Sequence, residues 1–305
     1  MIAYSDPVKS MRPVACIGVF DGVHLGHQYV ISQARSIADH GGNELIAITF
    51  DPHPLQVVNP DRAPEMIGTL EQRRALLMDA GVDRVHVINF SHEVSEQSSE
   101  EFVRQTLVAE INVAAVVVGA NFTFGHGASG TVDTLRELGD ALSFTVTEVG
   151  LSGGSSPVSS SRIRDHLRAG EIPEAQALLG HGYSMVGEVV FGDQRGRELG
   201  YPTANLKWAE HQNLLIPAEG VYAGFVQHAG GRDPAAISVG TNPQFQGVER
   251  RIEAYILDRT DFELYGQQVE FEFTKFLRAQ QVFGNLDDYL AQMAIDVQTA
   301  RELVC

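Results

Sequence analysis

The chain has 305 residues, with 39 acidic against 22 basic side chains and a formal net charge of −17. Its length indicates two domains, and its charge argues against general nucleic-acid binding, leaving only local donor clusters for a small anionic substrate. Two cysteines, Cys16 in an apolar run and Cys305 at the end, exclude a disulfide framework. Neither a secretion signal nor an apolar run of membrane-spanning length is present. We therefore expect a cytoplasmic protein that binds no nucleic acid and no membrane.

The first half of the chain alternates short apolar runs with segments of helical periodicity. Residues 114–119 (AAVVVG) are apolar throughout, as expected for a strand covered on both faces. Such alternation predicts a doubly wound α/β fold with a parallel sheet, in which ligands bind at the carboxyl ends of the strands. The predicted strands cover residues 14–20, 44–50, 84–90, 114–119 and 143–149, and the predicted helices cover 26–39, 70–80, 98–108 and 131–138.

The pattern changes after residue 151. A polar loop leads into two predicted short helices, 161–168 and 173–179, and then into β-rich sequence with glycine-rich turns. This patterning predicts a small antiparallel β-barrel, followed by a closing helix over 287–303. We expect one domain over residues 1–182 and a second over 183–305. The predicted barrel strands cover residues 185–192, 220–227, 235–240, 251–258 and 267–277.

The strongest motif, GVFDGVHLGH, lies where the first strand passes into the first helix. His24 and His27 flank Gly26 in an HxGH pattern. Two imidazoles at a helix start can donate to the oxygens of a nucleotide phosphate, where negative charge builds during nucleotidyl transfer. Gly26 lets the backbone approach closely. The alternative is one structural and one surface histidine, which the strand–motif–helix context disfavours.

Three further segments of the first half are weaker candidates. Ser160, Ser161 and Arg164 begin a short helix, which suits a polyphosphate but also ordinary helix capping. Asn121 follows a strand into a glycine-rich loop, where a turn-forming role is as plausible as a ribose or phosphate contact. His53, in TFDPHP, also follows a strand, although the flanking prolines could simply stiffen that loop.

The second half carries a glycine-rich loop, residues 191–206, which can wrap phosphates with backbone N–H groups. Thr203 and Asn205 lie two apart on an extended stretch, so they share a face and offer neutral oxygens suited to Mg²⁺. Glu253 and Tyr255 share a face of a later strand, and a carboxylate over the barrel mouth could accept the proton of an attacking alcohol. The alternatives are a glycine-rich hairpin and a solvated strand glutamate.

Taken together, these motifs resemble the prokaryotic bifunctional riboflavin kinase/FMN adenylyltransferase family, also called FAD synthetase. The likeness runs over residues 14–301, with Tyr201 standing where the family usually has Phe. The motifs that carry it are GVFDGVHLGH, TFDPHP, VVGANFTFG, SSSRIR, GRELGYPTAN, GVYA, VGTNP, a strand glutamate, ELYG and QM..D...AR.

The resemblance implies an N-terminal adenylyltransferase that joins AMP from ATP to FMN, and a C-terminal kinase barrel that phosphorylates riboflavin. It implies His24 and His27 as catalytic residues of the first site, Glu253 as the base of the second, Thr203 and Asn205 as ligands of Mg²⁺, and His53 and Arg278 as flavin contacts. It assigns nucleotide contacts to Gly18, Phe20, Asp21, Gly22, Asn121, Ser160, Ser161, Arg164, Gly192, Arg197, Gly200 and Pro202.

Two other hypotheses remain at this stage. The first is a kinase whose N-terminal half is only structural or oligomerising, against which the intact HxGH and SSxxIR patterns argue. The second is a flavin-binding sensor or carrier with little turnover, against which Thr203, Asn205 and Glu253 argue. Residues alone support a nucleotidyltransferase joined to a β-barrel with an Mg²⁺-nucleotide site. Flavin as the substrate rests on the resemblance, and a homo-oligomer is left open.

Overall fold

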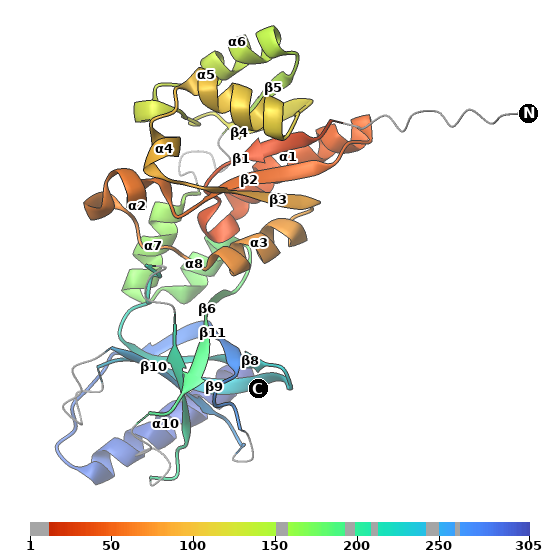
Figure 1. Cartoon of the computed structure of the whole chain (residues 1–305). Helices are drawn as coiled ribbons and strands as arrows, with labels where there is room; N and C mark the ends of the chain where they lie inside the picture. The colour runs from red at the N-terminus through yellow and green to blue at the C-terminus, as the bar shows by residue number, and fades with distance from the viewer. Residues whose placement is uncertain (1–11, 151–157, 193–198, 209–212, 242–249, 260–262) are drawn as a thin grey trace, which may run out of the picture. The chain divides into compact units, whose positions relative to one another are not determined.

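A computed structural model describes residues 12–150, 158–192, 199–208, 213–241, 250–259 and 263–305. Its internal contacts divide the chain into two compact units. The first comprises Met1–Pro64 and Leu70–Val158, and the second comprises Glu65–Thr69 and Ser159–Cys305. In Figure 1 the helices α7 (Ser160–Ala169) and α8 (Ile172–Leu179) are drawn in green and belong to the second unit. The predicted functional boundary near residue 182 stays a prediction.

The first unit is built on a five-stranded parallel sheet in the order β3-β2-β1-β4-β5. The chain runs outward from β1 to β3 and then returns to β4, so the strand order reverses between β1 and β4. Ligands of such sheets bind in the crevice at this point. The doubly wound prediction is confirmed. The strands are β1 Val14–Ile17, β2 Leu45–Asp51, β3 Arg84–Asn89, β4 Ala115–Gly119 and β5 Thr145–Val149.

Helices cover both faces of this sheet, because alternate strand residues point to opposite sides. Ile46 and Val116 pack with Leu107 and Leu135 in one core, and Leu45 and Val117 join a second core with residues of α1 and α3. Ser98 and Glu101 form a capping box at the start of α5. The helices are α1 Leu25–Gly41, α2 Pro54–Val58, α3 Leu70–Asp79, α4 His92–Ser95, α5 Ser99–Phe102 with a π-helical continuation Val103–Glu110, and α6 Val132–Leu142; short 3-10 turns are η1 Asp21–Val23, η2 Pro60–Arg62 and η4 His126–Ala128.

The second unit is a closed barrel with strand order β10-β7-β6-β11-β8-β9, every neighbouring pair antiparallel. The barrel prediction is confirmed, and α8 ends at Gly180, which takes the left-handed conformation that glycine adopts readily at a helix C-terminus. The closing helix α10 spans Leu286–Val304. The strands are β6 Tyr183–Val190, β7 Thr203–Lys207, β8 Gly220–His228, β9 Gly231–Gly240, β10 Arg251–Ile256 and β11 Gln268–Arg278.

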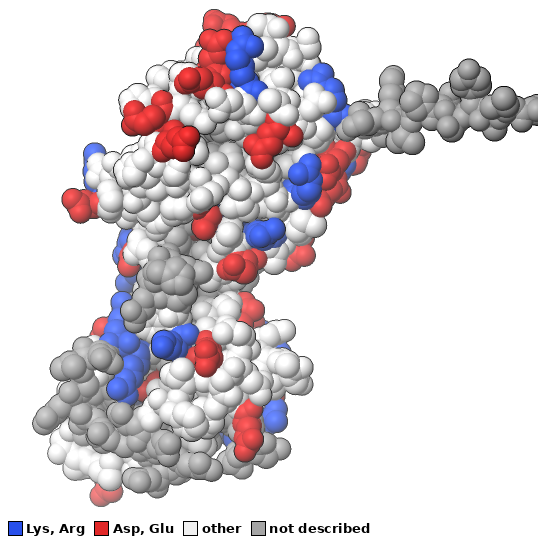
Figure 2. Space-filling model, in the orientation of Figure 1, with Lys and Arg blue, Asp and Glu red and all other residues white. Residues whose placement is uncertain are grey.

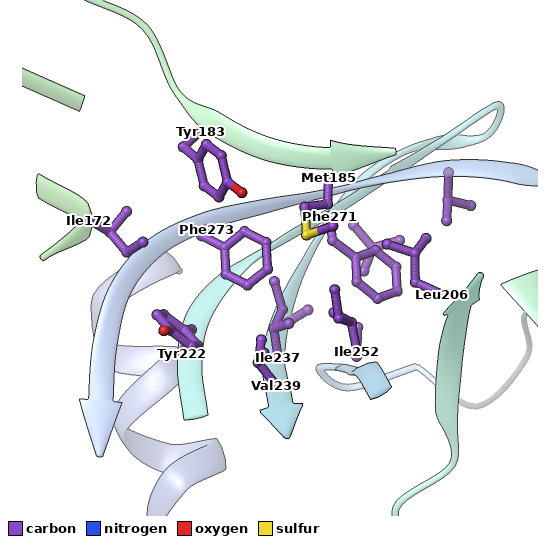
Figure 3. Packing of buried hydrophobic residues seen from close by; sticks show 14 of the residues in the cluster. Ile172, Tyr183, Met185, Leu206, Tyr222, Ile237, Val239, Ile252, Phe271 and Phe273 are labelled. Atoms are coloured by element: carbon purple, nitrogen blue, oxygen red, sulfur yellow. The ribbon is translucent and has the colours of Figure 1, made fainter. Parts of the chain in front are cut away.

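Large apolar side chains fill the interior of the barrel, as Figure 3 shows for residues of the strands β6 to β11. Tyr183 and Tyr222 are buried here with their hydroxyls bonded to the backbone carbonyls of Leu215 and Ala218. The same core includes Ile67 from the short segment that precedes α3, as well as side chains of α7 and α8. The inside of the barrel is therefore packed, and a substrate must bind outside it. The labelled interior residues are Tyr183, Met185, Leu206, Tyr222, Ile237, Val239, Ile252, Phe271 and Phe273.

Candidate active sites

The turn that follows β1 has an unusual backbone. The strand ends at Ile17, earlier than predicted, and Phe20 and Val23 adopt left-handed conformations with φ of 54° and 37°. Gly22, with φ of 76°, lies between them. For Val23, a β-branched residue, this region is a steric outlier. The turn buries Phe20, Asp21, Gly22 and Val23 and delivers the chain to the start of α1.

The two histidines of the HxGH motif lie face to face at the start of α1. His24 is 5% exposed and is the N-cap of the helix, because its Nδ1 accepts a 3.3 Å hydrogen bond from the His27 backbone N–H. The two rings stack with centroids 3.7 Å apart, and the Phe20 ring packs edge-on against His27 at 5.3 Å. A Cβ on Gly26 would lie 3.1 Å from Cε1 of His24, so the glycine leaves room for this ring.

Electrostatics keeps this histidine pair from carrying two positive charges. Burial lowers the pKa of His27 well below its ordinary value, and the charge of His24 lowers it further. Nδ1 of His27 is buried and has no hydrogen-bond partner among the described residues. Neutral imidazoles at the N-terminus of a long helix can donate hydrogen bonds to an anion, assisted by the helix dipole. Figure 2 shows acidic side chains spread over the visible face of this unit, so an anion depends on such local donors.

The other predicted residues of the first unit take different places. Gly18, like Phe20, Asp21 and Gly22, belongs to the turn after β1, and its N–H donates to Ile48 of β2. Asn121 is exposed, just beyond the carboxyl end of β4. His53 is the N-cap of α2, where its Nδ1 accepts from the Leu55 N–H at 3.0 Å. This capping role was not predicted, although the following proline is a normal first helical residue and signals a helix start.

The SSSRIR segment forms the first turns of α7 and is described with the second unit. Ser159 is the N-cap, which leaves Ser160 and Ser161 in the first turn. Arg164 is buried, and its Nε donates a 2.7 Å hydrogen bond to the carbonyl of Glu65. One contact of Arg164 is therefore structural, since it ties α7 to the segment Glu65–Thr69.

The second site is built by β7 and β10, which pair so that Glu253 lies opposite Asn205 and Tyr255 opposite Thr203. Ile252, Ala254 and Ile256 point into the barrel, so the alternating residues face outward. The hydroxyl of Thr203 donates a 3.2 Å hydrogen bond to Oε2 of Glu253. Both line a pocket that is closed by α10. The expected location at the barrel mouth is wrong, because strand alternation places Glu253 on the outer wall.

The glycine-rich loop reaches this site through Gly192. A Cβ there would lie 2.5 Å from the side-chain nitrogen of Asn205, so only glycine allows the amide to lie over this backbone. Gly200 has φ of +85°, and Pro202 leads directly into β7. Arg197 lies outside the described residues.

The wall of the pocket formed by α10 and the end of β11 carries a buried ion pair. The guanidinium of Arg278 contacts both carboxylate oxygens of Asp296, with the shortest distance 2.6 Å, and Gln292 donates to the same carboxylate. Tyr289 also lines the pocket, and its pKa is raised by burial and by the negative charge of Glu253. No role was predicted for Asp296 or Tyr289, although Asp296 is the acidic residue of the QM..D...AR motif.

A histidine pair at the start of a long helix, joined in one chain to a carboxylate–hydroxyl pair on a barrel wall, is typical of a two-site group-transfer enzyme. The comparisons with known proteins agree. A family model described as FAD synthetase matches residues 7–162, and one described as riboflavin kinase matches residues 179–304. The chain belongs to the bifunctional riboflavin kinase/FMN adenylyltransferase family.

Curated relatives with that name align along almost their whole length. The relative from Listeria monocytogenes is 36% identical over 97% of this chain and 94% of its own. Those from Escherichia coli K12 and Bacillus subtilis are each 32% identical, over 95% and 96% of this chain and 92% of their own.

A solved structure from Streptococcus pneumoniae, described as a macrolide-efflux protein, superposes with a TM-score of 0.84 at 30% identity, over 95% of this chain and 94% of that one. Within the described part of the chain, no helix has the length and apolar character needed to cross a membrane.

Proposed function

We propose that this chain makes FAD from riboflavin in two ATP-dependent steps, phosphorylating riboflavin to FMN on the barrel and adenylylating FMN in the α/β unit. The observation that carries this proposal is the His24–His27 stack at the start of α1, in a chain that also holds the Thr203–Glu253 pair. Both activities are supported by the name of the curated relatives, which align along almost the whole chain, and by the two family models that match its two halves. We place the enzyme in the cytoplasm, since Cys16 is a buried thiol and Cys305 is free.

In the kinase step, Glu253 is the general base. Its carboxylate accepts the proton of the terminal ribityl hydroxyl as that oxygen attacks the γ-phosphorus of ATP, and ADP leaves. The hydrogen bond from Thr203 holds the carboxylate in one orientation. We assign flavin contact on this side to Arg278, whose guanidinium lines the pocket and is held by Asp296.

Thr203 and Asn205 fit an Mg²⁺ ion that reaches the site with ATP. Both offer neutral oxygens on the outward face of β7, and no group of three or more His, Cys, Asp or Glu side chains suited to a metal occurs among the described residues. Mg²⁺ commonly takes only one or two protein ligands and fills its shell with phosphates and water. When bound, it neutralises charge on the transferred phosphoryl group.

In the adenylyl step, a phosphate oxygen of FMN attacks the α-phosphorus of ATP and pyrophosphate leaves. The Nδ1 atom of His24 accepts a hydrogen bond, which places the proton of the neutral ring on Nε2. Donation from His24 and His27 to the α-phosphate oxygens stabilises the charge that builds there. We assign nucleotide contact to the turn after β1, to Asn121, and to Ser160, Ser161 and Arg164, and flavin contact to His53. In the kinase we assign nucleotide contact to Gly192, Arg197, Gly200 and Pro202.

A time course tests this function. Full-length protein is incubated with riboflavin, ATP and Mg²⁺, and flavins are separated by chromatography; FMN should appear first and FAD should follow. His24→Ala should accumulate FMN with FAD formation lowered by about 10²–10³-fold, the usual effect of removing one such donor. Glu253→Gln should abolish FMN formation but still convert added FMN to FAD. Loss of both activities in a folded single-site variant would refute the two-site assignment.

A further inference from the structure

Arg73 on α3 is a buried guanidinium beneath the turn that carries the histidines. Its side chain is 3% exposed. One terminal nitrogen donates to the carbonyl of Val19 at 2.8 Å, and the other contacts Oδ1 of Asp51 at 3.3 Å. Nε is buried and has no partner among the described residues. Desolvation of a guanidinium is costly, and the single carboxylate contact compensates its charge only in part, so the burial of Arg73 calls for a functional explanation.

The carbonyl of Val19 is the point at which the turn is held. It accepts a second hydrogen bond, at 3.0 Å, from the hydroxyl of Thr49, which is fully buried in β2. The next residue, Phe20, has the left-handed backbone described above, which is strained for a non-glycine residue. Such a conformation persists only where the surroundings over-determine it. The two donors to Val19 supply that constraint.

The same guanidinium joins the ends of two neighbouring strands. Val19 lies just after β1 in the GVFDGVHLGH segment, and Asp51, which belongs to TFDPHP, is the last residue of β2. Burial lowers the pKa of Arg73, while the charges of Asp51 and Asp21 act in the opposite direction. Arg73 therefore stays positively charged. Its two terminal nitrogens link the HxGH turn to the TFDPHP segment and so fix the distance between them.

We propose that Arg73 is a positioning residue for adenylyl transfer: by holding the Val19 carbonyl it fixes Phe20 against the ring of His27, and thereby orients the His24–His27 stack. We assign Arg73 no contact with substrate, because its two terminal nitrogens are bonded to the Val19 carbonyl and to Asp51. This inference rests on the proposed function of the first site.

The test compares variants of the full-length enzyme, with added FMN for the adenylyl step and riboflavin for the kinase step. Arg73→Met should lower kcat for FAD formation by about 10- to 100-fold, because small misplacements of catalytic groups have effects of this size. KM for ATP and FMN should stay within about twofold, since binding contacts are not removed. Arg73→Lys should recover part of kcat, and Thr49→Val, which removes the other donor to Val19, should lower kcat in the same direction.

The kinase activity of each variant is the internal control and should not change. Arg84→Met is the matched control, because Arg84 is a half-exposed arginine of the same unit paired with Glu44, and its FAD formation should equal that of the wild type. An unchanged kcat in Arg73→Met, or a loss confined to KM, would overturn the inference. If Arg73→Met does not fold, Thr49→Val decides: a lowered kcat supports the inference and an unchanged one overturns it. Wild-type protein that makes no FAD would instead refute the proposed function.

Discussion

The ion pair between Arg278 and Asp296 fixes α10 against the barrel, and Asp296→Asn should expose how much it contributes. The two side chains are 16% and 9% exposed, and the carboxylate accepts from Nε and one terminal nitrogen of Arg278 and from Gln292. Asparagine keeps the shape and one acceptor. It removes the charge and turns an NH₂ group toward a guanidinium that stays buried.

The geometry sets the expected size of the effect. Unit charges at the observed 2.6 Å attract by about 6 kcal/mol at an effective dielectric constant near 20. Desolvation offsets part of this attraction, but removal of one partner leaves the other charge uncompensated, which typically costs about 3–5 kcal/mol. Because Asn retains one acceptor, we expect the free energy of unfolding of the barrel to fall by about 2–4 kcal/mol. The riboflavin KM should rise, since Arg278 lines the pocket.

Urea unfolding followed by tryptophan fluorescence measures this effect. The chain has a single tryptophan, Trp208, which packs against the barrel core, so its emission reports on the second unit. With a denaturant slope of about 2 kcal/mol/M, the midpoint should fall by about 1–2 M. Asp258→Asn is the matched control: Asp258 pairs with Arg301 of the same helix in similar two-oxygen geometry, but both are at the surface.

The control variant should scarcely move the midpoint, because exposed ion pairs contribute little. If Asp296→Asn shifts the midpoint no more than Asp258→Asn does, the buried pair is not what holds α10 in place. A fall in stability with an unchanged riboflavin KM would show that Arg278 does not contact the flavin.

Three other outcomes are expected. Gly192→Ala, whose Cβ would lie 2.5 Å from Nδ2 of Asn205, should lower the kinase kcat by about tenfold and leave FAD formation from added FMN unchanged. Wild-type stability of the first unit should fall as pH drops below the ordinary histidine pKa, by at most about 1.4 kcal/mol per pH unit for this group, because folding opposes protonation of His27. Calorimetry can follow unfolding of the first unit, on which Trp208 does not report. In His27→Gln the stability of this unit should depend less steeply on pH than in the wild type, and an equal dependence would exclude His27 as the cause. Burial raises the pKa of Cys16 to about 12, so alkylation at pH 8 should add one label, on Cys305, to the native protein and two after unfolding, by mass spectrometry.

Local sequence determined much of this protein. The alternation of apolar runs and helical segments predicted the parallel sheet and the barrel, because strand and helix periods depend on residues two to four positions apart. The HxGH motif placed two histidines at a helix start, where their rings stack, and its role as an anion site stays a prediction. The alternation along β10 by itself placed Glu253 and Ile252 on opposite faces, although it could not say which face lay inside the barrel.

Tertiary structure decided which distant side chains meet. Arg73 reaches Val19 across 54 positions, and Arg164 reaches Glu65 across 99. Neither arginine differs, in its local pattern, from the solvated arginines of a helix. Tertiary packing of the helix decides whether such a side chain is buried and which carbonyl accepts its hydrogen bond. The periodicity of the sequence holds no information about either. For the same reason no local pattern indicated that Glu65–Thr69 joins the second unit, since that segment is recruited only by the core formed by α7, α8 and the barrel.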